Sequence, residues 1–220
     1  MTDDQSKNEL VEAYRNLVAN GLNRGSSGNI SVRYGSGMLI TPSAIACEEL
    51  DPSMIAYMEL DAETEVWTGP KRPSTEWRFH KDILRTRPEM NAVVHTHAPY
   101  STILSAARKP IPAVHYMMAA FGGPDIRVSG YARYGSAALS AHVREALEDR
   151  NGYLMANHGM VVGGADLTRT MWLAAELEEL AHIYYHTELI DGAHILTIEK
   201  LEETLVGFAD YGVQSKGQPA

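Results

Sequence analysis

The N-terminal third of the sequence contains the pattern of a β-hairpin. Two apolar segments, 29–33 and 38–41, flank the turn-forming residues Tyr34-Gly35-Ser36-Gly37. A second pair of apolar segments, 152–157 and 160–162, is interrupted by only two residues. Strands joined by connections this short pair antiparallel, because a parallel pair needs a long crossover. The chain is therefore expected to form a sheet that is mostly antiparallel.

Segments with helical spacing alternate with these strands. In the first of them, Leu10, Val11, Tyr14 and Leu17 recur at helical intervals before Gly21. Helices are predicted at 8–19, 74–87, 99–107, 137–148, 167–190 and 197–208, and further strands at 54–58, 65–68, 92–94 and 125–129. This alternation indicates the α/β class: a single layered domain over residues 1–220, with a central sheet flanked by helices. A flexible tail is expected after about residue 214.

The composition of the chain argues against several kinds of partner and metal ligand. The formal net charge of −9 argues against a nucleic-acid partner, which clustered Lys and Arg would favour, but it does not exclude a small anionic substrate. No apolar run is long enough to cross a bilayer, and the N-terminus lacks the features of a signal peptide, so we expect a cytoplasmic protein with no membrane partner. Cys47 is the only cysteine, so a bound metal would need nitrogen and oxygen ligands.

Three histidines are candidate metal ligands. His95 and His97 follow a buried strand-like segment, and residues two apart on a strand point to the same face. His158 lies between two apolar strands, a position where functional side chains are often presented. Three histidines with one open position are typical of a catalytic zinc site. By itself, a His-x-His triplet is more often structural. The pair His182 and His186 is better explained as a helix face.

Glu76 is the candidate general base, since a carboxylate near a dication is easily ionised. Its alternative role is that of an acidic residue in the first turn of the helix predicted after Pro73. Three small polar loops suit an anion such as phosphate. They are Gly28-Asn29, Thr41-Pro42-Ser43 and Ser74-Thr75. Each is also compatible with an ordinary turn or helix cap.

Taken in order, these segments resemble the zinc-dependent class II aldolase/epimerase family of sugar phosphates, and within it the fuculose-phosphate aldolases. The resemblance extends from the first helix to Tyr211 and includes the less generic stretch 111–117. It implies that Zn²⁺ is bound by His95, His97 and His158, with Glu76 as the fourth ligand of the resting metal and as the base. It also implies that the substrate phosphate is held by Gly28, Asn29, Ser43, Ser74 and Thr75.

The resemblance further implies a homotetramer with active sites between subunits. Tyr116 of a neighbouring subunit would act as the acid, and Phe208 and Tyr211 would close the aldehyde pocket. Tyr134 occupies a pocket position where the fuculose-phosphate enzymes have phenylalanine. This departure bears on aldehyde preference and leaves the metal ligands and the base untouched.

The implied reaction is reversible cleavage of a phosphorylated sugar. A ketose 1-phosphate resembling L-fuculose 1-phosphate would give dihydroxyacetone phosphate and a small aldehyde such as lactaldehyde. The alternatives within the family are an aldolase for 5-deoxyribulose or 5-methylthioribulose 1-phosphate, a pentulose-phosphate 4-epimerase, a dehydratase and a decarboxylase. A scaffold module without catalytic activity is the least favoured, because all the expected metal ligands and the base are present.

Overall fold

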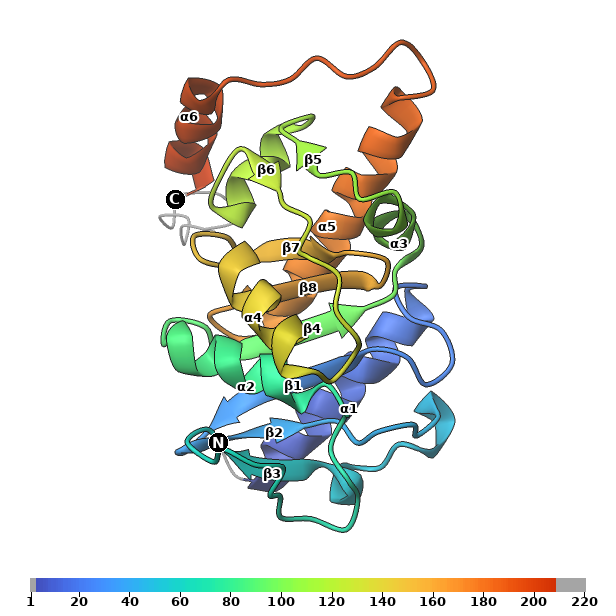
Figure 1. Ribbon diagram of the computed structural model, residues 1–220, viewed down its shortest axis with the longest axis vertical. Coiled ribbons are helices and arrows are strands. Elements are labelled where there is room, and N and C mark those ends of the chain that lie inside the picture. Colours follow the sequence, from blue (N-terminus) through green and yellow to red (C-terminus); the bar gives the residue numbers. More distant parts are fainter. Residues whose placement is uncertain (1–2, 209–220) are drawn as a thin grey trace, which may run out of the picture.

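The computed structural model describes residues 3–208 and confirms the predicted α/β class (Figure 1). Its centre is a six-stranded antiparallel sheet with strand order β3-β2-β1-β4-β8-β7. The strands are β1 (Asn29–Tyr34), β2 (Gly37–Ile40), β3 (Ala56–Glu59), β4 (Ala92–Thr96), β7 (Gly152–Met155) and β8 (Gly159–Gly164). The tail predicted after about residue 214 and the expected pocket residue Tyr211 lie outside the described residues.

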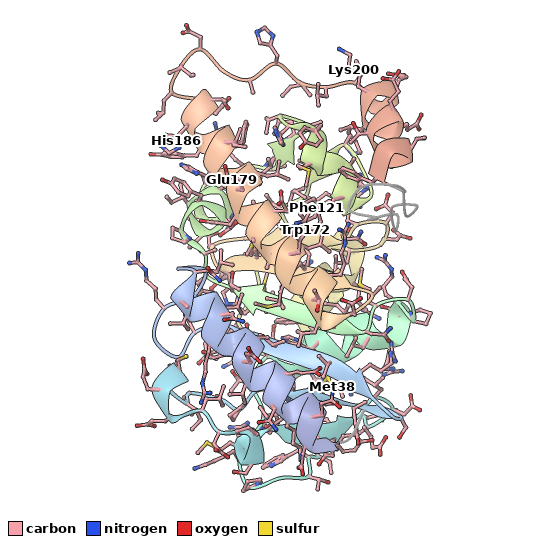
Figure 2. The ribbon with its side chains drawn as sticks, turned by 180° about the vertical axis from the view of Figure 1, so that it is seen from behind. Met38, Phe121, Trp172, Glu179, His186 and Lys200 are labelled. Atoms are coloured by element: carbon pink, nitrogen blue, oxygen red, sulfur yellow. The ribbon has the colours of Figure 1, made fainter. Side chains whose placement is uncertain are left out.

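Helices cover both faces of the sheet (Figures 1 and 2). One face carries α1 (Asp3–Ala19), α3 (Pro99–Ala106) and α5 (Leu167–Thr187), and the other carries α2 (Trp77–Thr86) and α4 (Ala137–Ala146). The strands supply both cores because successive side chains point to opposite faces. On β4, for example, Val94 belongs to the first core and Val93 to the second. The residue after Val94, His95, is therefore expected on the face that carries α2.

Smaller elements gather at one end of the molecule. The short strands β5 (Ile111–Pro112) and β6 (Asp125–Ile126) pair with each other, and a 3₁₀ helix, η3 (Tyr116–Phe121), lies between them in the chain. The last described helix, α6 (Ile198–Phe208), packs against η3 (Figure 1). None of the described helices combines the length and apolar character needed to span a membrane.

Two strand predictions were wrong in detail. The segment 65–68 makes only one bridge, from Thr68 to Tyr57, because Glu65 is instead held by two hydrogen bonds from Arg72. The strand predicted at 54–58 begins at Ala56, since Pro52–Met54 forms a 3₁₀ turn. In that turn the Asp51 side chain accepts from the Ser53 N–H. Both segments lie at the β3 edge of the sheet, away from the histidines.

Candidate active site

His95 occupies the centre of the sheet. Its partners across β1 and β8 are Asn29 and Val161, and its side chain is completely buried. The Nδ1 atom lies 2.9 Å from the carbonyl oxygen of Met160. A carbonyl only accepts, so Nδ1 carries the proton and donates, which leaves the Nε2 lone pair free. This outer hydrogen bond is the usual way in which a ligating histidine is oriented.

His97 and His158 are brought to the same point by the pairing of β4 with β8. Thr96 pairs with Met160, which places the end of β4 beside the turn that precedes β8. Within that turn, Asn157 adopts a left-handed φ of 56°, which asparagine tolerates better than most residues. The adjoining Gly159 has no room for a side chain, because a Cβ there would lie 2.4 Å from the Thr96 carbonyl oxygen and 2.9 Å from the His97 ring.

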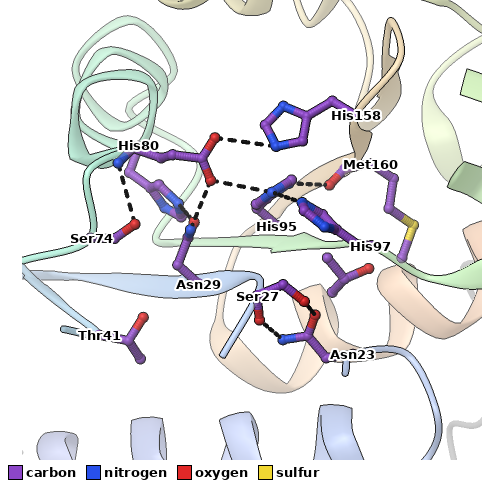
Figure 3. Close-up of polar contacts among 12 residues, drawn as sticks. Asn23, Ser27, Asn29, Thr41, Ser74, His80, His95, His97, His158 and Met160 are labelled. Atoms are coloured by element: carbon purple, nitrogen blue, oxygen red, sulfur yellow. Dashed lines mark hydrogen bonds and ion pairs between the residues drawn. The ribbon is translucent and has the colours of Figure 1, made fainter. Parts of the chain in front are cut away.

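The three imidazole rings face one another (Figure 3). Their centroids are 4.8 to 4.9 Å apart, and one potential ligand nitrogen from each ring lies within 4.8 Å of the others. The Nε2 atoms of His95 and His97 are 3.1 Å apart. Two nitrogen ligands of a tetrahedral zinc ion with bonds of about 2.0 Å would be about 3.3 Å apart. The observed separation is therefore close to that of a metal site.

The environment keeps these histidines neutral. Burial lowers the pKa of His95 to about 3, with a further lowering by His97 that the Met160 carbonyl partly opposes. Burial, reinforced by His95, lowers the pKa of His158 to about 4. Burial also lowers the pKa of His97 below its usual value. Neutral imidazole is the form that binds metal ions, so the site is prepared for a cation without first losing protons.

Glu76 reaches the histidine cluster from the start of α2. It is the N-cap residue of α2, so the prediction that it lies inside the first helical turn was wrong by one position. Its side chain makes no capping hydrogen bond and points to the histidines instead. Its Oε2 atom lies 3.3 Å from His95 Nε2, and its Oε1 atom lies 3.4 Å from His158 Nε2.

The donor set fits a divalent cation. Glu76 is 6% exposed, and among the described residues its Oε1 atom is buried without a hydrogen-bond partner. A buried carboxylate oxygen with no donor is costly, and the nearby His95 Nε2 presents a lone pair, not a proton, to the other oxygen, Oε2. A metal ion would satisfy all four groups. The set of three nitrogens and one carboxylate matches the ligands that zinc accepts.

A cavity of about 420 Å³ opens above this cluster. Its lining includes most of the residues expected from the sequence: Gly28, Asn29, Ser43, Ser74, Thr75, Glu76, His97, Tyr134 and His158. His95 lies beneath them, fully buried. The lining also includes Pro42 of the predicted Thr41-Pro42-Ser43 loop, Ser27 and Ala44 directly beside predicted loops, and Ser26. The predicted metal and phosphate groups are thus neighbours in one cavity.

Two of the three phosphate loops pair with each other. Pro42 and Pro73 form an antiparallel bridge, in which the Ser43 N–H donates to the Arg72 carbonyl and the Ser74 N–H to the Thr41 carbonyl. These two N–H groups, expected to bind an anion, are therefore already occupied. The hydroxyl groups of the two serines remain, and no Lys or Arg lies among the described residues that line the cavity.

Tyr116 and Phe208 are absent from the described lining of this cavity. Tyr116 is 46% exposed at the start of η3. Phe208 lines a different cavity of about 620 Å³, together with Met117 and Trp172. Both residues thus belong to the end of the molecule formed by η3 and α6, and within one chain they do not complete the histidine site.

His80 lies beside the site, although it is not among the ligands, base or phosphate-binding residues predicted from the sequence. It is completely buried, and it contacts Asn29 and Ser31 directly beside Glu76. Burial, with a contribution from His95, holds the pKa of His80 well below its usual value. The signal that could have identified it is the spacing of four residues from Glu76, which places both at the same side of α2.

The α/β fold carries a possible three-histidine metal site, and comparison with known proteins identifies its class as that of the aldolases, which are lyases. The family model described as the class II aldolase and adducin N-terminal domain matches residues 8–185. The chain therefore belongs to the class II aldolase family, whose members generally depend on a metal and act on phosphorylated sugars.

Individual relatives are similar over nearly their whole length. A 5-methylthioribulose-1-phosphate/5-deoxyribulose-1-phosphate aldolase of Rhodospirillum rubrum is 47% identical over 203 residues, covering 92% of this chain and 90% of the relative. An L-fuculose phosphate aldolase of Escherichia coli O6:H1 is 41% identical over 207 residues, covering 94% and 95%. A solved structure of an L-fuculose 1-phosphate aldolase superposes with a TM-score of 0.88 at 34% identity, covering 92% of this chain and 95% of the other.

Proposed function

We propose that the protein catalyses the reversible aldol cleavage of a ketose 1-phosphate to dihydroxyacetone phosphate and a small aldehyde, with Zn²⁺ as its metal. The observation that carries this proposal is the convergence of His95, His97, His158 and Glu76 on one point at the floor of a cavity lined by small polar residues. Aldol cleavage leaves an enediolate whose oxygen charge a cation can stabilise and whose carbon exchanges a proton with an acid–base group, and this cluster offers both.

The substrate phosphate would occupy the small polar loops. Within residues 3–208, the N–H groups of Gly28, Ala44 and Thr75 donate no backbone hydrogen bond, and Ser43 and Ser74 belong to the same cavity lining. Backbone N–H groups before a helix N-terminus favour an anion. Because no Lys or Arg of residues 3–208 lines the cavity, these neutral donors would carry phosphate recognition.

The carbonyl end of the substrate would then lie over the histidines. A dication held by His95, His97 and His158 would supply Lewis-acid stabilisation of the negative charge that develops on the substrate oxygens. Glu76 would move the proton of C3 through Oε1, the carboxylate oxygen that has no hydrogen-bond partner. In the condensation direction Glu76 takes this proton, and in cleavage it returns the proton. Tyr116 would supply and receive the proton on the C4 oxygen.

Two aldehyde classes are candidates, and the relatives favour the less polar one. The 5-methylthioribulose/5-deoxyribulose 1-phosphate aldolase is more similar to this chain than the fuculose phosphate aldolase, at 47% against 41% identity. These substrates differ at the aldehyde end, where Tyr134 belongs to the cavity lining. We therefore favour 5-deoxyribulose or 5-methylthioribulose 1-phosphate and retain L-fuculose 1-phosphate as the alternative. The epimerase, dehydratase and decarboxylase reactions receive no comparable support.

The test is a comparison of three ketose 1-phosphates with the purified metal-loaded protein. Release of dihydroxyacetone phosphate would be followed with a coupled reductase, and kcat/KM would be determined for L-fuculose, 5-deoxyribulose and 5-methylthioribulose 1-phosphate. We expect cleavage, with a kcat/KM for the favoured pair at least about 10-fold above that for L-fuculose 1-phosphate, roughly the discrimination that a small apolar group allows. The opposite ranking would restore the fuculose assignment, and no release from any of the three would refute the proposed reaction.

We further propose that the active protein is a homotetramer in which Tyr116 and the C-terminal residues complete the site of a neighbouring subunit. The support is the location of Tyr116 and Phe208 outside the histidine cavity of their own chain. A heterologous interface of this kind brings one surface of each subunit against a different surface of the next.

Mixed oligomers provide the test of this arrangement. Glu76→Gln and Tyr116→Phe subunits, each inactive alone, would be co-expressed with different tags and purified as hybrids. If each site combines Glu76 of one chain with Tyr116 of the next, about a quarter of the sites in randomly mixed rings are intact, and about a quarter of the wild-type rate returns. If both residues act within one chain, every site is defective and the hybrids stay inactive.

A further inference from the structure

A continuous chain of buried side chains runs from the sheet to the base. His80 Nδ1 lies 2.7 Å from the Ser31 hydroxyl, and His80 Nε2 contacts Asn29 Oδ1. The amide nitrogen of Asn29 then donates to Glu76 Oε2 at 3.0 Å. Figure 3 shows the link from His80 through Asn29 towards the histidine cluster. Ser31 and His80 are fully buried, and Asn29 is only 4% exposed.

The chemistry of these groups fixes the direction of every hydrogen bond. Glu76 Oε2 only accepts, so the Asn29 amide nitrogen must face it and the Asn29 carbonyl oxygen must face His80. That oxygen also only accepts, so His80 Nε2 carries the ring proton and donates. The neutral ring then accepts at Nδ1 from the Ser31 hydroxyl. A flipped Asn29 amide would set its carbonyl oxygen against Glu76 Oε2, two acceptors, so the flip is disfavoured.

We propose that His80 is a positioning residue that holds the Glu76 carboxylate in one orientation through Asn29. This proposal rests on the proposed aldol reaction and assigns His80 a role in supporting its base. With Oε2 anchored, Oε1 is the oxygen left without a partner, 3.4 Å from His158 Nε2. His80 thereby selects which oxygen of the base is free to exchange a proton, although His80 itself does not line the cavity and the described hydrogen bonds of its ring go to Asn29 and Ser31, not to the three histidines or Glu76.

The contrary explanation is that His80 only fills the core. Its ring stacks on Phe79 with centroids 4.6 Å apart, and Phe79 in turn meets the edge of the His95 ring at 5.7 Å. If this packing is the whole role of His80, any smaller side chain would lower stability and disturb the site. The effect would be the same whether or not the new side chain can donate a hydrogen bond to Asn29. The two explanations therefore differ in their dependence on the position of the donor.

Two amide substitutions separate these explanations. In His80→Gln the amide lies near the position of Nε2 and can donate to Asn29, whereas in His80→Asn it lies near the position of Nδ1 and cannot reach Asn29. We expect His80→Asn to lower kcat about 10- to 100-fold, the usual effect of removing an outer orienting group. KM and bound metal should change little, and His80→Gln should recover most of the rate. Equal losses, or no loss in either variant, would overturn the proposal.

Two further measurements test the proposal without comparing the rates of His80→Asn and His80→Gln. Because His80 acts through Asn29, the His80→Asn loss should disappear in an Asn29→Ala background, and losses that multiply would contradict the proposal. A crystal structure of His80→Asn should show the Asn29 amide turned away from Glu76 with the three histidines unmoved. An unchanged Asn29–Glu76 hydrogen bond would overturn the proposal. The crystallographic result holds even if the wild-type protein cleaves none of the three sugars, an outcome that would refute the proposed reaction alone.

Discussion

Replacement of Glu76 by glutamine is expected to lower kcat for aldol cleavage by about 10²- to 10⁴-fold, the usual contribution of a general base. Glutamine has nearly the same shape and can still accept the hydrogen bond from Asn29 at one oxygen. It cannot take a proton at the position of Oε1, which is the atom without a partner. The substitution therefore removes the proton transfer and preserves the cavity.

The three histidines remain in Glu76→Gln, so the protein should still bind close to one metal ion per chain. Metal content by elemental analysis and kcat by release of dihydroxyacetone phosphate would be measured on the same sample. Glu145→Gln, at an exposed position of α4, is the matched control and should behave as wild type. Turnover of Glu76→Gln at the wild-type rate would rule out Glu76 as the base.

The double substitution His95→Ala/His97→Ala should abolish both metal binding and cleavage. It leaves His158 and Glu76, and two ligands do not make a closed three-histidine site. We expect metal content to fall from about one ion per chain to near zero, with the cleavage rate at the background of the assay. Urea unfolding of both proteins in chelator would separate loss of metal from loss of the fold.

The chain offers its own control for this experiment. His182 and His186 lie four residues apart on α5. The His182 ring stacks on Tyr100 with centroids 4.3 Å apart, and the His186 ring is tilted against Tyr100 at 5.4 Å. Among the described residues they are not part of a group with three potential metal ligands. His182→Ala/His186→Ala should therefore keep its metal and its activity. A fully metal-loaded His95→Ala/His97→Ala protein would show that the ion binds elsewhere.

Much of the fold could be predicted because its signals are local. The hairpin β1–β2 follows from two apolar segments around one glycine-containing turn, and the helices follow from apolar spacing. The strand prediction at 65–68 was wrong because the segment has the composition of a strand but lacks a neighbouring strand to pair with along its length. That segment has one bridge, to Tyr57, and an ion pair with Arg72 that local sequence does not reveal.

The parts of the site that consist of residues close together in the sequence could be predicted. The spacing of His95 and His97 predicts that both point to the same side at the end of β4, whereas their meeting with His158 depends on the register of β4 against β8. The positions of Tyr116 and Phe208 within one chain could not be inferred from motifs. His80 was missed because its partners Ser31 and Asn29 lie 49 and 51 residues away in sequence and are brought to it only by the packing of α2 on the sheet.

The central claim is that the three-histidine centre with Glu76 holds the metal on which cleavage depends. Its most direct measurement is the rate of dihydroxyacetone phosphate release as Zn²⁺ is returned to chelated, metal-free protein, with bound metal quantified at each step. We expect no cleavage without metal and a linear rise that saturates near one ion per chain. Full activity in the metal-free protein, or saturation with metal without any cleavage, would contradict the claim.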